Sequence, residues 1–415
     1  MAWMFRRRKK PEQQAALSPE LSTPREPLWT KNFSLIWLIN LAVMSWSFML
    51  NASFPIYILD LGGTEMLVGI TVAAVGVAAL TTRPLTGWMM DNSSRSSMLR
   101  VGIVLLLTIS AILFFVPILL VAVIARILGG FMFAAATTST HTNAADSIPK
   151  SRFGEGIGIL GTANTIANAL APALGLALIA GRGSRALFAA CTALILFAIF
   201  MERGLKYKTI EKDTSNPRRK KIDIRKLFDK EAVPASLLLF FSAVPFGGVI
   251  AFIAIFGELY ELGSGGWFFA INAAGTGSTR VFSGRIVDLR GEKPMIILGN
   301  ICVVLALLLL LFDSSAAFYL SGLFFGFGFG LLIPALQAMS MRIAPLEKRG
   351  AATGTFLCGF DLSISIGGLS AGFLVTMLGY RPMFTSLAIF PIISFLLYFL
   401  WASKSPSAFK YATKK

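Results

Sequence analysis

The stretch TRPLTGWMMD at residues 82–91 returns as TRVFSGRIVD at residues 279–288. The copies lie 197 positions apart (82 to 279), and Gly102 and Gly299 keep this offset. At an offset of 196 positions (130 to 326), further small residues and prolines correspond: Gly130 with Gly326, Ala134 with Gly330, Pro149 with Pro345, Gly154 with Gly350 and Gly158 with Gly354. Agreement across several segments at nearly one offset predicts two halves related by an internal repeat.

The composition places these halves in a lipid bilayer. Of 415 residues, 55% are hydrophobic and 14% are charged, whereas soluble domains carry about 25% charged residues. A transmembrane helix needs about 20 apolar residues, and we count twelve such runs. We therefore predict an all-α membrane protein with 12 transmembrane helices in two six-helix pseudo-repeats, at 33–58, 66–90, 98–117, 119–145, 154–180, 185–202, 233–258, 266–286, 294–312, 316–342, 350–377 and 382–402.

Hydrophilic segments divide this array. We expect a cytosolic tail at 1–32, a six-helix bundle at 33–202, a cytosolic linker at 203–232, a second bundle at 233–402 and a cytosolic tail at 403–415. The two tails and the linker hold seven, four and eleven of the 38 Lys and Arg residues. Because such residues mark cytoplasmic loops, we expect a multi-pass protein of the plasma membrane with both termini in the cytosol.

The chemistry-bearing residues argue against an enzyme. A single His and three widely spaced Cys exclude a disulfide framework and a structural zinc site. No phosphate-binding loop, nucleophile elbow or metal-ligand cluster is present in the sequence, so we expect no catalytic residues, metal or cofactor. The net charge of +17 follows from the topology, and we expect no binding to nucleic acid. The expected partners are the lipid bilayer, a small-molecule substrate and protons, and we expect a monomer.

Residues 87–95, GWMMDNSSR, resemble the signature that transporters of the major facilitator superfamily carry after their second helix, and residues 284–293 resemble its counterpart after the eighth. The resemblance implies that superfamily's fold, with a substrate site between the two halves. It also implies a gating motif, in which Asp91 accepts hydrogen bonds at the start of the span near Gly350 and pairs with Arg95. A helix cap with a topogenic charge is the alternative. The motif residues are Gly87, Asp91, Arg95, Gly284 and Asp288.

Two ionisable residues lie inside predicted spans. Arg126, with Gly130, resembles the R-x-x-x-G motif of proton-coupled members of the superfamily. Because a charge at the bilayer centre costs about 2.5–3.5 kcal/mol, Arg126 is expected to face the cavity or a partner. Asp361 must face water, pair across helices or be protonated. Its stretch resembles the eleventh helix of Gram-positive exporters of drugs and metallophores, including staphylopine exporters. We predict proton coupling or substrate binding for both residues, with a structural role as the alternative.

Weaker sequence patterns bear on the direction of transport and on the lining of the cavity. In the fifth span, Ala171, Pro172 and Gly175 resemble a degraded form of the superfamily's efflux signature and favour export. Five amide side chains are candidates to line the cavity, although each is equally suited to bridging helices: Asn51, Asn164, Asn168, Asn272 and Gln337.

The sequence therefore predicts a secondary active transporter that works by alternating access. We expect proton-coupled efflux, or antiport, of a small amphipathic solute such as a drug or metallophore. One alternative is an uptake permease for a sugar or another small metabolite. A second alternative, of another class, is a non-transporting membrane receptor or scaffold.

Overall fold

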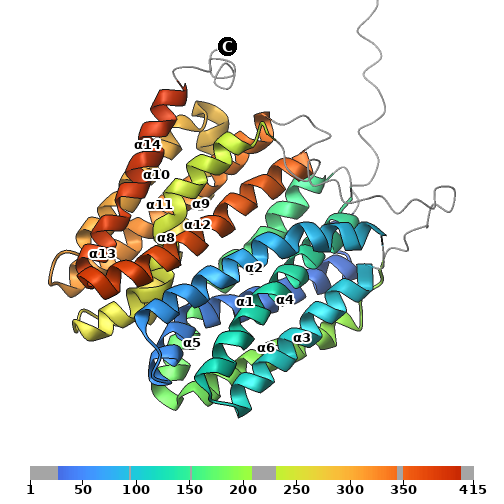
Figure 1. The fold of residues 1–415 in the computed structure, drawn as a ribbon. Helices are drawn as coiled ribbons and strands as arrows, with labels where there is room; N and C mark the ends of the chain where they lie inside the picture. Colours follow the sequence, from blue (N-terminus) through green and yellow to red (C-terminus); the bar gives the residue numbers. More distant parts are fainter. Residues whose placement is uncertain (1–26, 93–94, 150–151, 208–229, 344–348, 403–415) are drawn as a thin grey trace, which may run out of the picture.

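The computed structural model describes residues 27–92, 95–149, 152–207, 230–343 and 349–402, and every regular element in these ranges is a helix. Figure 1 shows two groups of helices, one in blue and green and one in yellow to red. The first group contains α1 (Lys31–Asp60), α2 (Glu65–Asn92), α3 (Arg95–Phe115), α4 (Leu119–Ser147), α5 (Phe153–Arg182) and α6 (Ser184–Glu202). The second contains α8 (Val233–Leu259), α9 (Gly265–Arg290), α10 (Lys293–Leu309), α11 (Ser315–Ile343), α12 (Arg349–Leu378), α13 (Tyr380–Leu387) and α14 (Ile389–Ala402).

The predicted fold class is confirmed, because each expected span coincides with helix. Ten helices of the described chain are long and apolar enough to cross a membrane, with α13 and α14 counted as one span. Two further helices are not among these ten: α10, which is shorter, and α9. The expected domain boundaries stay a prediction.

The last predicted span, 382–402, differs from expectation because it consists of two helices. It breaks at Ala388, between α13 and α14. Pro391 has no backbone N–H to donate to the carbonyl of Leu387, and its ring collides with that carbonyl in a continuous helix. The break therefore follows from one proline within an apolar run.

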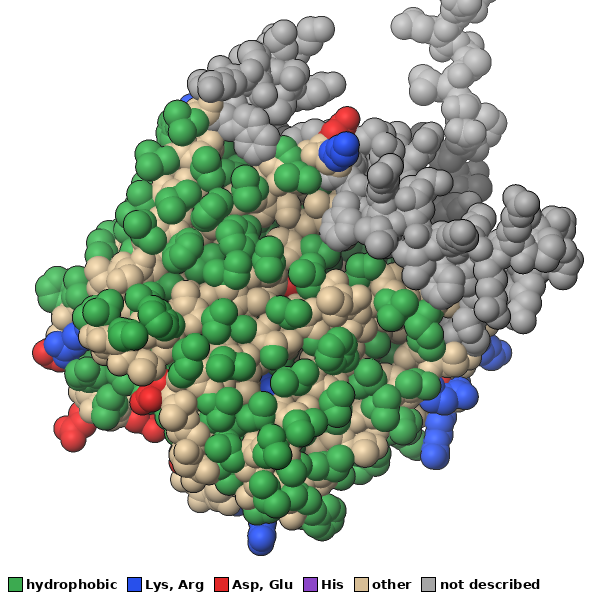
Figure 2. Space-filling view, in the orientation of Figure 1, with side chains coloured by type: hydrophobic (Ala, Val, Ile, Leu, Met, Phe, Trp, Pro, Cys, Tyr) green, Lys and Arg blue, Asp and Glu red, His purple; other side chains and the backbone are tan. Residues whose placement is uncertain are grey.

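The surface fits a lipid environment. Figure 2 shows hydrophobic side chains over most of the visible face, with Lys, Arg, Asp and Glu side chains mainly at its margins. Many of the exposed side chains are large and apolar, among them Phe115, Leu120, Phe200, Trp267 and Met377. A surface of this kind marks contact with a membrane or another apolar partner.

The two most extensive contacts between the halves are helix pairs that the repeat relates. Within the halves, α1 packs on α5 and α12 packs on α8, while between them α2 packs on α12 and α5 packs on α9. The offset of 197 positions relates α2 to α9, and the offset of 196 positions relates α5 to α12. One inter-half contact is therefore the repeat-related counterpart of the other.

Glycines allow close packing inside the second half. A Cβ added at Gly367 of α12 would lie 1.9 Å from the carbonyl oxygen of Val244 in α8. A Cβ added at Gly247 of α8 would lie 2.3 Å from the carbonyl oxygen of Ile364. Small residues let membrane helices approach backbone to backbone, so these two glycines set the spacing of α8 and α12.

We expect Gly367→Ala to lower the stability of the purified protein by roughly 1–3 kcal/mol, because the new methyl group overpacks this contact. The measurement is the thermal unfolding temperature in detergent. Gly181→Ala is the matched control, since nothing lies within 4 Å of a Cβ added there. Equal unfolding temperatures for the two variants would contradict the packing role of Gly367.

Candidate functional site

An ion pair joins the two halves inside the membrane-spanning part. Asp361 lies on α12 and Arg83 lies on α2. The Nε of Arg83 donates to Oδ2 of Asp361 at 2.7 Å, and its Nη2 donates to Oδ1 at 3.3 Å. The side chains are 23% exposed for Arg83 and 10% exposed for Asp361. This two-point geometry, between a planar guanidinium and a carboxylate, is the strong form of a charged hydrogen bond.

Glycines bring α2 and α12 together on one side of this ion pair. A Cβ added at Gly76 would lie 2.7 Å from the carbonyl oxygen of Asp361, and one added at Gly69 would lie 2.6 Å from that of Gly368. Gly372 also approaches Gly69 closely. We call this contact, from Gly69 and Gly372 to Arg83 and Asp361, the α2–α12 seam.

The second inter-half contact carries a related arginine. Arg280 of α9 donates from Nη1 to Oγ1 of Thr165 in α5. Arg280 corresponds to Arg83 at the offset of 197 positions, and Thr165 corresponds to Asp361 at the offset of 196 positions (165 to 361). Each arginine thus reaches the equivalent position of the opposite half. Among the described residues, only Arg83 of these two has a carboxylate partner.

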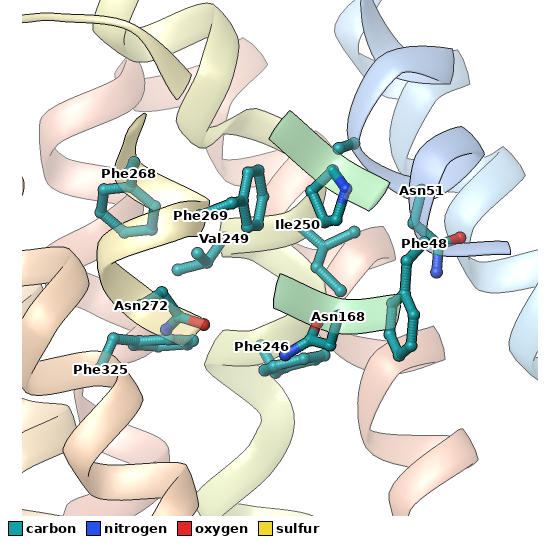
Figure 3. Close-up of a pocket in the computed structure, with 12 residues that line it drawn as sticks. Phe48, Asn51, Asn168, Phe246, Val249, Ile250, Phe268, Phe269, Asn272 and Phe325 are labelled. Carbon is teal, nitrogen blue, oxygen red and sulfur yellow. The ribbon is translucent and has the colours of Figure 1, made fainter. Parts of the chain in front are cut away.

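A small cavity lies between the halves, where α1, α5, α8, α9 and α11 meet (Figure 3). Only about 10 Å³ of it is open to the centre of a water molecule, which is near the minimum that holds one water. In this conformation the cavity has no room for a solute. Its lining consists of Phe48, Asn51, Ala52, Asn168, Pro172, Phe246, Val249, Ile250, Phe268, Phe269, Asn272 and Phe325.

Arg126 reaches this cavity through an amide. The residue is 4% exposed on α4, and its Nη2 donates to Oδ1 of Asn51, which lines the cavity. Its guanidinium carbon also lies 5.3 Å from the centre of the Phe54 ring, a distance at which the ring face attracts a cation. Among the described residues, no carboxylate forms an ion pair with Arg126.

The amide candidates divide into two groups. Asn51, Asn168 and Asn272 line the cavity, whereas Asn164 does not. Oδ1 of Asn164 accepts a hydrogen bond of 2.9 Å from Nδ2 of Asn40, so this side chain bridges α5 and α1. Gln337 lies half-buried on α11 and is also absent from the lining.

The helix-bend residues lie where α5 meets α1 and the cavity. Pro172 lines the cavity, and Ala171 is buried. A Cβ added at Gly175 would lie 2.6 Å from Cγ of Met49, so this glycine lets α5 approach α1. The backbone at the five gating-motif residues is helical, but their side chains lie outside the described part: Gly87, Asp91, Arg95, Gly284 and Asp288.

The sequence reasoning missed the roles of Arg83 and Arg280, which it used only to define the repeat. The position of both arginines inside predicted spans could have indicated these roles, since an arginine inside a membrane helix needs a partner or water. Asp361 needed a partner by the same rule. The sequence separation of 278 residues hid the pair.

Comparison with known proteins decides the family. A profile of the Major Facilitator Superfamily matches residues 35–265 and 235–415. The chain belongs to the major facilitator superfamily. It is therefore a membrane transporter for small molecules and not an enzyme, and the family prediction is confirmed.

Curated relatives in this superfamily include bacterial exporters. The staphylopine export protein of Staphylococcus aureus is 23% identical over 380 residues, which cover 89% of this chain and 95% of that protein. A homologue of the multidrug resistance efflux pump PmrA from Lactococcus lactis is also 23% identical, covering 90% of this chain and 95% of its own length.

Solved structures show the same fold at lower identity. The nucleoside transporter NupG superposes with a TM-score of 0.70 at 12% identity, covering 90% of this chain and 99% of that one. A bacterial homologue of the human lysosomal transporter Spinster, in an inward-facing and unoccupied conformation, superposes with a TM-score of 0.73 at 13% identity, covering 93% and 99%.

We expect Asp361→Asn and Arg83→Gln each to lower stability by about 3–5 kcal/mol, because each leaves one charge unpaired inside the membrane. The double variant should regain part of this loss. Thermal unfolding in lipid nanodiscs measures the cycle. Asp313→Asn is the control, since Asp313 pairs with Arg381 but is 68% exposed. Strictly additive losses at positions 83 and 361 would show that the two side chains are not coupled.

Proposed function

We propose that this protein exports a small amphipathic solute in exchange for protons. The observation that carries the proposal is the ion pair between Arg83 and Asp361, which joins the two halves. Alternating access requires the halves to separate on one side and then on the other. A titratable group at their junction is therefore suited to link proton binding to that movement.

The physical link runs through the charge of Asp361. When the carboxylate binds a proton, its net attraction to the Arg83 guanidinium is lost, and the α2–α12 seam loses its electrostatic contact. Protonation on one side and release on the other then drive the conformational cycle.

The charge distribution supports the orientation on which this cycle depends. With both termini in the cytosol, as the basic tails and linker favour, α2 runs from the outer surface towards the cytosol. The end of the α2–α12 seam at Gly69 and Gly372 is then the outer end. In this arrangement the described conformation is closed on the outside, in a multi-pass protein of the plasma membrane.

Two observations favour export of an amphipathic solute. The S. aureus and L. lactis relatives bear the names of an exporter and of a homologue of an efflux pump, and they match nearly the whole chain. The cavity has five phenylalanines beside three asparagines. Apolar and aromatic walls with a few polar groups are typical of sites for small organic molecules.

We expect Asp361→Asn to abolish solute movement driven by a pH gradient while solute exchange without a gradient continues. The gradient-driven rate should fall to background, because an amide cannot take up and release a proton as a carboxylate does. Transport in proteoliposomes is measured with cationic ethidium, zwitterionic norfloxacin and anionic 2-naphthoate. Glu258→Gln, at an exposed position near the end of α8, is the control.

Unchanged gradient-driven transport by Asp361→Asn would remove Asp361 from proton coupling. Accumulation of the probes only on the side of the protein's cytosolic face would show uptake instead of export. If the wild-type protein moves none of the three probes under any gradient, the proposed function is wrong.

A further inference from the structure

Arg280 is exposed although it lies near the middle of α9. A lipid-facing arginine at this depth is excluded by its contact, since its Nη1 donates to Thr165 on α5 of the opposite half. The guanidinium therefore lies at the contact between the two halves. In this respect Arg280 differs from Arg126, which is only 4% exposed and is held by Asn51 and Phe54.

Within the described part of the chain, Arg280 uses one of its N–H donors. A guanidinium has five N–H donors, and Thr165 accepts from one of them. The Thr165 hydroxyl is itself satisfied, because it donates to the carbonyl oxygen of Gly161 at 3.2 Å. Within the described part of the chain, no carboxylate pairs with Arg280.

The contrast with Arg83 shows what Arg280 lacks. The two arginines are repeat-related, and each contacts the equivalent position of the other half. At that position Arg83 meets the carboxylate of Asp361, whereas Arg280 meets the hydroxyl of Thr165. An uncompensated arginine at mid-depth costs about 2.5–3.5 kcal/mol. A bound anion would supply the charge that Asp361 supplies to Arg83.

The surroundings of Arg280 indicate the kind of anion. Asn272 lies two helical turns from Arg280 on α9, about 12 Å along the axis, and Asn168 lies one turn from Thr165 on α5, about 4.5 Å along the axis. Both asparagines line the phenylalanine-rich cavity (Figure 3). A molecule that reaches from Arg280 to this cavity must combine an anionic head with an apolar body.

We propose that Arg280 binds a carboxylate of the transported solute, whose apolar part contacts Phe246, Phe269 and Phe325. This assignment rests on the proposed transport function. The planar fork of arginine matches a carboxylate at two points. The solute is therefore an amphipathic organic acid, and Arg280 distinguishes it from a neutral molecule of the same shape.

The test compares 2-naphthoate with 2-naphthamide, which share one ring system but differ in charge. Binding to the protein in lipid nanodiscs is measured with radiolabelled probes, and binding to empty nanodiscs is subtracted. We expect the wild-type protein to favour the acid about ten-fold, which corresponds to about 1.4 kcal/mol. Arg280→Gln should abolish this preference, and Arg280→Lys should retain part of it. Arg182→Gln, an exposed charge at the end of α5, should leave it unchanged.

Other results overturn the assignment. The assignment is wrong if the wild-type protein does not bind 2-naphthoate, or if it binds both probes with equal affinity. It is also wrong if Arg280→Gln lowers the affinity for both probes equally. Complete displacement of 2-naphthoate by an equal concentration of sulfate would show a site for inorganic anions instead. A retained preference for the acid in a protein that moves no solute would refute the proposed transport, whereas gradient-driven transport without the preference would refute only the role of Arg280.

Discussion

A charged side chain in the hydrocarbon part of a membrane must meet an opposite charge, polar groups or water. This constraint decides where the two halves of this transporter touch. Arg83 satisfies it with Asp361 of the opposite half, and Arg126 satisfies it with the Asn51 amide and the Phe54 ring. Because the charges of Arg83 and Asp361 lie on different halves, any movement that separates the α2–α12 seam changes their electrostatic environment at once.

The internal repeat makes this arrangement informative, since each half serves as a reference for the other. The same residue type, arginine, is kept on α2 and α9, while its acceptor differs, being Asp361 in one contact and Thr165 in the other. A difference between otherwise equivalent contacts is more telling than either contact alone. The shared arginine is a requirement of the architecture of both contacts. The acceptor, a carboxylate in one contact and a hydroxyl in the other, is specific to each contact.

The helices could be predicted from the length of the apolar runs, and the membrane-spanning class follows from composition. The break at Ala388 was missed because Pro391 lies within a continuous apolar run. At the site, Asn51, Asn168 and Asn272 line the cavity, whereas Asn164 accepts a hydrogen bond from Asn40. Which face of a helix meets which neighbour depends on packing between distant segments. A single sequence does not contain that information, and for the same reason the partner of Asp361 was not predicted.

The α2–α12 seam has a further consequence for the kinetics of the protein. Gly69, Gly368 and Gly372 have no side chains that interlock, so the helices meet there as two smooth backbone surfaces. Separating them changes no rotamer at these three glycines, and the side chain that packs on Gly368 is the small Val72 of α2. Among the described residues, the seam contains one ion pair, between Arg83 and Asp361, and this pair must break when the seam opens. Such a contact is expected to separate in one step, and not residue by residue along the two helices.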